Sequence, residues 1–232
     1  MGGRGGSSHR AGGGGMPPNA NNMELAELKN RLNAMHISFD VRLERVDIAV
    51  LRDTYNAVMA MYREFPGAVG QINRITADAS ANAYASAHPY GYLNMNPALM
   101  GEKRSLQMTY ARDLRSGFHP AGTKSEDIMI HEMGHQLEAV LVGRQHRQGT
   151  NAFVTTWNTH TVANSIVRDA VEAVHASGDR RPESRLIAEI SGYAKKNKAE
   201  TLAEAVADFY ANRENAKPLS KEIWKRLKKE LN

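Results

Sequence analysis

A predicted helix in the middle of the chain places two histidines and a glutamate among apolar residues. The pattern HExxH, residues 131–135, lies inside this helix, which we expect over residues 125–141. Histidines four positions apart project from one helix face, one turn from each other. A buried group of two imidazoles and a carboxylate is costly without a cation. The chain must therefore fold so that a second segment meets this helix and completes a cation site.

The helix is preceded by a pattern typical of a helix start. Thr123 is followed three residues later by Glu126, just before the apolar run, which predicts a capping box with Thr123 as the N-cap. Gly143 falls near the expected end. The alternative interpretation of HExxH, two surface histidines on an exposed helix, conflicts with the apolar residues on both sides of the motif.

HExxH on a helix is typical of zinc sites in which the glutamate is the general base. The chain contains no cysteine, so any metal site must use His, Asp or Glu. A zinc ion that keeps one position open for water needs a third protein ligand. Positions 138 and 141 hold Glu and Leu, which excludes the extended motif with Gly and a third His there.

An acidic ligand on a second helix is the remaining option. Glu200, Glu204 and Asp208 stand at i, i+4 and i+8 on one face of a helix expected over residues 200–212. Several alanines give this helix small side chains, which permit close approach to another helix. A solvated acidic stripe is the alternative interpretation. A buried acidic stripe needs a cation, and the histidine pair would supply one.

The segment from Ser191 to Ala205, SGYAKKNKAETLAEA, resembles the second motif of lethal-factor-like zinc peptidases. In that family a tyrosine is followed four residues later by an asparagine and then by E-x-x-A-E-A. The resemblance implies that Tyr193 stabilises the oxyanion and that Glu200 is the third zinc ligand. It also implies that Glu204 is a carboxylate behind the ligands, and we expect Asp208, the next acidic residue on that face, to lie behind them as well. It covers residues 131–135 and 191–210 and implies a zincin-like, gluzincin-type fold.

A weaker likeness is to metallopeptidase-like proteins from phage and prophage head-gene regions. Three features carry it: the turn FHPAGT at residues 118–123, Asn96-Pro97 after a strand, and the glycine-rich start MGGRG. This likeness implies a phage origin, and it implies nothing about the peptide that is cleaved.

Hydrophobic periodicity predicts an α+β fold with strands in the first half and helices in the second. We expect a disordered glycine-rich tail over residues 1–22 and a single domain over 23–232. The domain comprises a half with a small mixed or antiparallel sheet (23–122), the HExxH helix (123–142) and a helical half (150–232). Within these we expect strands at 36–42, 71–77 and 83–96, the last an edge strand or a bulged strand because it contains Pro89 and Gly91. Helices are expected at 23–33, 44–64, 159–176, 182–190, 200–212 and 220–231, and a loop at 149–157.

The net charge of +5 does not predict a nucleic-acid partner. Residues 1–22 contribute +2 and residues 217–232 contribute +4, which leaves −1 for residues 23–216. The sequence has no groove-reading motif or stacking platform, so we expect no nucleic-acid partner. It also has no apolar run of about 18 residues and no signal peptide. We therefore expect no membrane partner and a cytoplasmic protein, virion-associated if phage-encoded, of open oligomeric state.

These patterns together predict a zinc endopeptidase that acts on a protein or peptide substrate. Glu132 would be the general base and Tyr193 the oxyanion donor, with zinc held by His131, His135 and Glu200. The substrate would lie extended along the strand at 83–96. His119 and Tyr90 are candidate substrate contacts, with a loop-stabilising role for His119 and a core position for Tyr90 as alternatives. The rival hypothesis is a phage or prophage head-associated assembly protein with a zincin fold and little or no peptidase activity.

Overall fold

The computed structural model describes residues 20–79 and 83–232. The predicted tail lies outside the described residues except for 20–22, which belong to the first helix. The helices and strands of the first half are α1 (Ala20–Ala34), β1 (Ser38–Phe39), α2 (Ile48–Glu64), β2 (Arg74–Ala77), β3 (Ala85–His88), β4 (Tyr92–Met95), α3 (Pro97–Met100) and α4 (Lys103–Arg115). The central helix is α5 (Ile128–Gln145). The second half contains α6 (Asn151–Asn158), α7 (Thr161–Ala176), α8 (Glu183–Ile190), α9 (Lys198–Asn212) and α10 (Pro218–Leu231).

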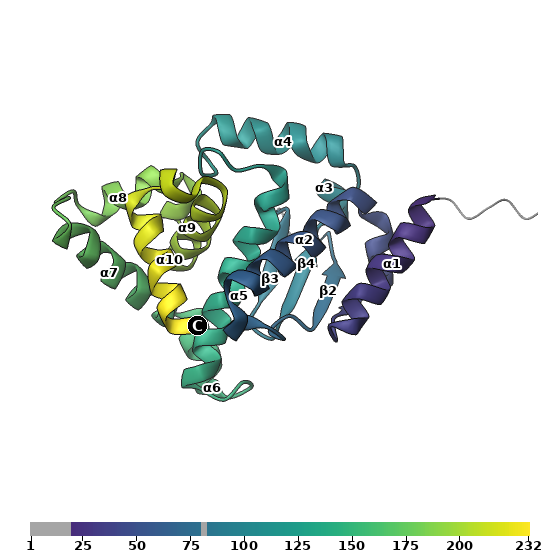
Figure 1. Cartoon of the computed structure of the whole chain (residues 1–232), viewed down its shortest axis with the longest axis horizontal. Coiled ribbons are helices and arrows are strands. Elements are labelled where there is room, and N and C mark those ends of the chain that lie inside the picture. Colours follow the sequence, from purple (N-terminus) through teal and green to yellow (C-terminus); the bar gives the residue numbers. More distant parts are fainter. Residues whose placement is uncertain (1–19, 80–82) are drawn as a thin grey trace, which may run out of the picture.

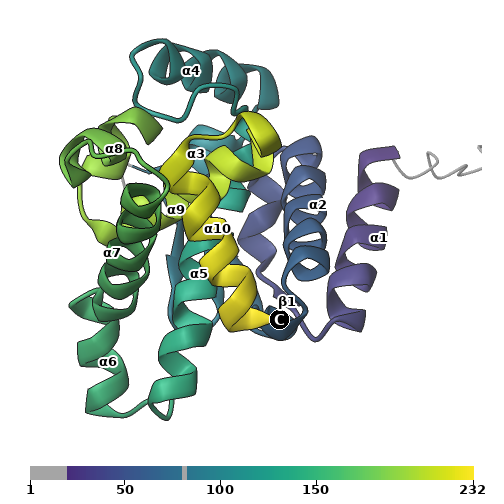
Figure 2. The same ribbon diagram turned by 60° about the vertical axis from the view of Figure 1, so that its left-hand side comes forward.

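The predicted α+β class is confirmed. Figure 1 shows α5 between a sheet-containing half, with α1 and α2, and the group of helices α7–α10. Helix α10 packs on α7 and α9 (Figure 2), and its apolar face contributes Ile223, Trp224 and Leu227 to the core. No helix in the described part of the chain is long and apolar enough to cross a membrane.

The sheet is small and mixed, with strand order β1-β2-β4-β3. Strands β1, β2 and β4 are parallel neighbours, and β3 pairs antiparallel with β4 in the register Ala85↔Met95 to His88↔Tyr92. The expected single strand at 83–96 is therefore wrong, because this segment is a hairpin. The chain reverses at Gly91, whose φ of 83° favours glycine and whose N–H donates to the His88 carbonyl at 3.0 Å.

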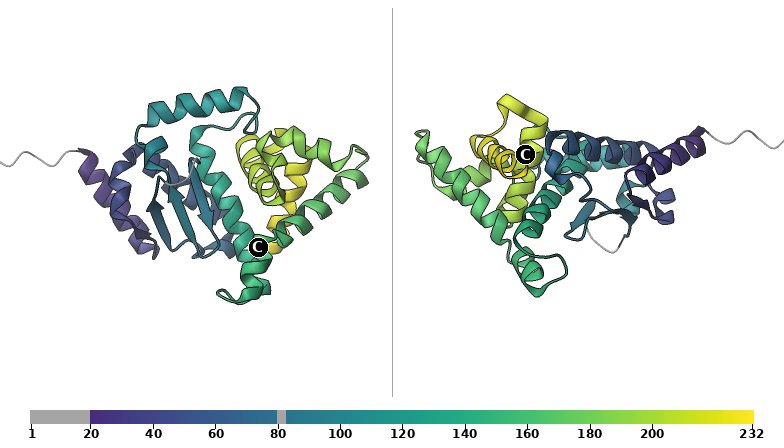
Figure 3. Two further views of the ribbon diagram at one scale, coloured as in Figure 1. Left: turned by 180° about the vertical axis from the view of Figure 1, so that it is seen from behind. Right: turned by 60° about the horizontal axis from the view of Figure 1, so that its bottom comes forward.

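One face of the sheet is buried and the other is open. Ile75, Ala77, Leu93 and Met95 are almost completely buried, whereas their neighbours along the strands are exposed or half-buried. Helix α2 lies across one face in Figure 1, and the opposite view in Figure 3 shows the strands with none of the described helices over them. Strand β3 is the last in the strand order, so it is an edge strand, and it packs against α5.

Two local predictions around α5 are wrong. The capping box is formed by Lys124 and Asp127, since the Asp127 Oδ2 accepts from the Lys124 N–H at 2.8 Å. The Thr123 hydroxyl instead lies 2.8 Å from that of Tyr110 and donates to the Pro120 carbonyl. The cap shifts by one residue because a 3-10 turn, Ser125–Asp127, precedes α5.

The expected loop at 149–157 contains helix α6. The Thr150 hydroxyl caps it by accepting from the Phe153 N–H at 3.2 Å, and the Phe153 side chain is completely buried. Eight residues with a single buried aromatic position do not give a periodic pattern, so the helix was not predicted. Tertiary packing of Phe153 stabilises it.

Helices α5 and α9 approach each other closely at Gly134, inside the HExxH motif. A Cβ atom at this position would lie 2.8 Å from the Ala203 Cα and 3.4 Å from the Val206 Cβ. The expectation that the helix with small side chains packs against another helix is confirmed, and the absence of a side chain at Gly134 permits it. This contact brings the acidic face of α9 to the two histidines.

Gly134→Ala is expected to lower the free energy of unfolding by about 1–2 kcal/mol, since overpacking outweighs the better helix propensity of alanine. Gly143→Ala, on the same helix, is the matched control because no atom of the described part of the chain lies within 4 Å of a Cβ there. The control should be neutral or more stable by up to about 1 kcal/mol. Urea unfolding measures both, and equal stability of the two variants would contradict the close approach.

Candidate metal centre

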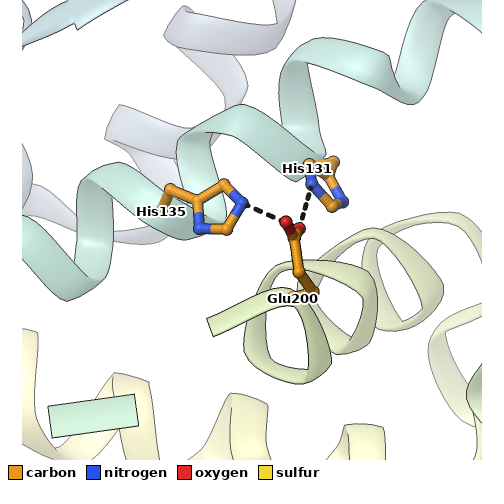
Figure 4. A group of neighbouring side chains, drawn as sticks. All are labelled: His131, His135 and Glu200. Atoms are coloured by element: carbon orange, nitrogen blue, oxygen red, sulfur yellow. Dashed lines mark hydrogen bonds and ion pairs between the residues drawn. The ribbon is translucent and has the colours of Figure 1, made fainter. Parts of the chain in front are cut away.

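The two histidines of α5 converge on one carboxylate of α9 (Figure 4). The Glu200 Oε2 lies 3.3 Å from the His131 Nε2 and 3.2 Å from the His135 Nε2. The ligand atoms of these three residues all lie within 4.8 Å of one another. Among the residues that the structure describes, this is the one group of at least three acidic or histidine side chains that could hold a metal ion.

The start of α9 fixes the position of Glu200. The Asn197 Oδ1 accepts from the Glu200 N–H at 2.9 Å, so Asn197 is the N-cap and Glu200 lies in the first turn. Because the helix begins there, Glu200 faces α5 one turn before Glu204. The asparagine in the sequence motif therefore has a structural role that sets the register of the acidic face.

Glu204 lies behind His131, where the resemblance places it. Its Oε1 is 2.7 Å from the His131 Nδ1, and its Oε2 accepts from the Ser191 hydroxyl at 2.6 Å. The Glu204 side chain is buried. The Glu204 carboxylate thus forms a close ion pair with the ring nitrogen of His131 that does not face Glu200, and histidines that bind metals commonly have a carboxylate there.

The charges in this cluster are strongly coupled. Burial lowers the pKa of His131, but the carboxylates of Glu200 and Glu204 outweigh it and raise this pKa to about 10. Burial raises the pKa of Glu204, yet His119 and His131 bring it down to about 2. The pKa of Glu200 is also lowered, because its two histidine partners outweigh burial. A cation at this position would therefore stabilise the buried carboxylates. A metal ion bound by two imidazoles and one carboxylate would be such a cation.

Glu132 and Tyr193 border the same centre. Glu132 is buried and burial raises its pKa. The Tyr193 hydroxyl donates to the Glu200 Oε1 at 3.0 Å. Backbone hydrogen bonds hold this tyrosine against the turn before α5, from the N–H of Gly192 to the Gly117 carbonyl and from that of Tyr193 to the Phe118 carbonyl.

Two hollows meet at the centre. The smaller, about 280 Å³, lies between the edge strand β3 and the start of α9, and is lined by His135, Trp157 and Glu200. The larger, about 370 Å³, extends towards α4 and has apolar walls that include Tyr84, Phe118 and Ile128. Ala83, Ala85, His131, Glu132 and Tyr193 line both hollows. A ligand in this cleft would lie beside the open edge of the sheet.

Asp208 does not contact the histidines, so its assignment to their surroundings is wrong. Its Oδ1 accepts from the Asn212 side chain at 2.8 Å, and its Oδ2 accepts from the Lys217 N–H at 2.9 Å. Two turns beyond Glu200, α9 has already passed the histidine pair. Asp208 instead stabilises the connection from α9 to α10.

The two candidate substrate contacts differ in position. Tyr90 lies at the hairpin turn and stacks on Phe153, with ring centroids 5.6 Å apart, and it lines neither hollow. The packing on Phe153 fits the core alternative, and a substrate contact by Tyr90 stays a prediction. His119 lines the larger hollow, so its substrate contact stays a prediction. Its ring also stacks on Tyr110 at 4.4 Å, which holds the turn before α5.

Three residues at the site escaped prediction from the sequence. Gln136 is completely buried, and its side-chain N–H groups donate to the carbonyls of His88 and Tyr92, which ties the hairpin to α5. A polar residue inside an apolar helix was the available signal. His160 lines the smaller hollow with a left-handed φ of 51°, and Lys196 donates to Tyr193 and Glu200. Neither carries a sequence signal beyond its residue type.

Glu138 is a further buried carboxylate on α5, one turn beyond His135. Its Oε1 accepts from the Ala163 N–H in the first turn of α7 at 3.2 Å, while its Oε2 has no hydrogen-bond partner among the described residues. Burial raises the pKa of Glu138 from 4.5 to about 7. The pKa of Glu138 is higher in the folded protein than in the unfolded one. The contribution of this carboxyl group to the free energy of unfolding is therefore fully present below about pH 4.5 and is lost as the pH rises to about 7.

Glu138→Gln should therefore gain stability relative to the wild type as pH rises. With a chelator present, we expect the difference in free energy of unfolding to grow by about 2–3 kcal/mol in favour of the variant between pH 5 and pH 8. Glu172→Gln, at an exposed position of α7, is the control and should show no such trend. Urea unfolding at both pH values measures the difference, and a constant difference would contradict the raised pKa.

Comparison of the chain with protein-family models, with curated proteins and with solved structures finds no match.

Proposed function

We propose that the protein is a zinc-dependent endopeptidase. The observation that carries this proposal is the convergence of the HExxH histidines with Glu200, in a cleft that also contains Glu132 and Tyr193. Two imidazoles and one carboxylate are a common protein ligand set for catalytic zinc, because they leave a position open. A structural site would need neither a buried carboxylate beside the ion nor a hydroxyl facing it.

His131, His135 and Glu200 would hold the ion. When bound, zinc would act as a Lewis acid and lower the pKa of a water molecule to about 7. Glu132 then accepts a proton from the attacking water and delivers it to the leaving amine. A raised pKa suits this role, because a general base works best when its pKa lies near the working pH. The Tyr193 hydroxyl donates to the developing oxyanion, and loss of such a donor typically costs about 3–4 kcal/mol.

The edge strand β3 supports a peptide substrate in particular. Its free edge flanks the smaller hollow, where Ser86 and Ala87 form part of the lining together with His131. An extended peptide can add to such an edge through main-chain hydrogen bonds, independently of its side chains. The larger hollow next to Glu132 would receive an apolar side chain of the substrate, given its walls.

The test is digestion of a proteome-derived peptide library followed by mass spectrometry. The zinc-loaded protein should cut peptides at defined bonds, a chelator should abolish the cleavage, and added zinc should restore it. If the zinc-loaded protein leaves the library uncut, the assembly-protein hypothesis with an inactive site replaces the peptidase proposal.

A further inference from the structure

Lys196 contacts both residues that face the metal centre from the α9 side. Its Nζ donates to the Tyr193 hydroxyl oxygen at 3.0 Å and to the Glu200 Oε1 at 3.0 Å. The same ammonium lies 4.8 Å from the centroid of the Tyr193 ring. Lys196 therefore joins the tyrosine to the carboxylate, although its own side chain is 56% exposed.

The two carboxylate oxygens of Glu200 have different partners. Oε2 lies between the two histidine Nε2 atoms, at 3.2 and 3.3 Å, whereas Oε1 accepts from Lys196 and Tyr193. Rotation of the carboxylate would break both donor contacts to Oε1. The ammonium thus holds the carboxylate in the one orientation that presents Oε2 to the site between the imidazoles.

The same contacts fix the hydroxyl proton of Tyr193. An ammonium has three donors and no acceptor, so the tyrosine oxygen must accept from Lys196 and use its own proton as a donor elsewhere. In the structure that proton goes to Glu200, on the side of the metal centre. Without Lys196 the hydroxyl could rotate, because no other residue in the described part of the chain donates to its oxygen.

The contact between Lys196 and Glu200 differs from an ordinary surface ion pair. An ordinary exposed i,i+4 ion pair contributes little, but here one partner is a buried metal-site carboxylate with a 10% exposed side chain.

We propose that Lys196 is a positioning residue of the metal centre: it orients the Glu200 carboxylate towards the ion and directs the Tyr193 hydroxyl proton to the side of the metal centre. The inference rests on the metal centre of the proposed function but does not require peptide hydrolysis. Partners that orient a metal ligand typically account for 10–100-fold in metal affinity.

Zinc affinity of the full chain, measured by competition with a chromogenic chelator, tests this role. Lys196→Met should bind zinc about 10-fold more weakly than the wild type. Lys196→Arg should keep a zinc affinity within about threefold of the wild type, because the guanidinium can donate to both oxygens. Lys195→Met, a change at the exposed neighbour on the same turn, should leave it unchanged. Thermal unfolding of the metal-free variants should match the wild type, which separates positioning from a folding defect.

The possible failures are distinct. If the wild type binds no zinc, the metal centre itself is wrong. If the wild type binds zinc and Lys196→Met binds it equally well, Lys196 is a surface ion pair and the inference is overturned. An equal loss of zinc affinity and of metal-free stability in Lys196→Met and Lys196→Arg would also overturn the inference, since the effect would then be structural.

Discussion

Replacement of Glu200 by alanine is expected to weaken zinc binding by at least about 100-fold. Residues that merely orient a ligand account for 10–100-fold, and Glu200 provides the oxygen that both histidines face. The loss should also appear in stability. Free zinc at about 100 times the wild-type dissociation constant should stabilise the wild type by about 2.7 kcal/mol, and the variant by about 0.4 kcal/mol or less.

The measurement is thermal unfolding with and without added zinc, together with zinc content after gel filtration. Glu214→Ala, at an exposed position beyond the end of α9, is the matched control and should retain the full zinc-dependent stabilisation. If Glu200→Ala keeps one zinc per chain and the same stabilisation, the third ligand is a different residue and the proposed site is wrong.

Glu132→Gln is expected to retain the metal and to lower kcat by about 10²–10⁴-fold. Glutamine preserves the shape of the side chain but cannot accept the proton of the attacking water. Because Glu132 is not among the three residues that could hold the ion, zinc affinity should stay close to that of the wild type. The rate is measured on a peptide identified from the library, alongside zinc content.

Glu172→Gln, on the exposed face of α7, provides the control for a change of one carboxylate to an amide. It should retain the wild-type rate and zinc content. A Glu132→Gln protein that cleaves as fast as the wild type would show that the general base lies elsewhere. Loss of zinc from this variant would mean that Glu132 supports the ion rather than the proton transfer.

The longer helices could be predicted from the sequence because their burial is periodic. Helices α2, α7 and α10 each present a continuous apolar stripe to the core, and their observed bounds fall within a few residues of those expected. The hairpin and α6 depend on contacts that are distant in sequence. Gln136 of α5 binds carbonyls at both ends of the hairpin turn, and α6 is held by the burial of Phe153. Periodicity within a segment carries no information about such contacts.

The same distinction applies to the site. His131 and His135 could be paired from their helical spacing, and the need for a cation pointed to the acidic face with Glu200, Glu204 and Asp208. The choice of Glu200 on that face came from the resemblance to lethal-factor-like zinc peptidases. Asp208 shares the helical face of Glu200 but lies too far along α9, and only the crossing of α5 and α9 at Gly134 decides that. In the sequence nothing distinguishes Lys196 from the other lysines, because its proposed role depends on where Tyr193 and Glu200 meet in space.

The central claim is that His131, His135 and Glu200 hold one zinc ion. Anomalous X-ray scattering at the zinc absorption edge, from a crystal of the zinc-loaded protein, tests it most directly. We predict a single strong peak between α5 and α9, at about 2.0–2.1 Å from the Nε2 atoms of both histidines and about 2.0–2.2 Å from a Glu200 oxygen. A zinc-loaded crystal with no peak at these residues, or with its strongest peak elsewhere, would contradict the account.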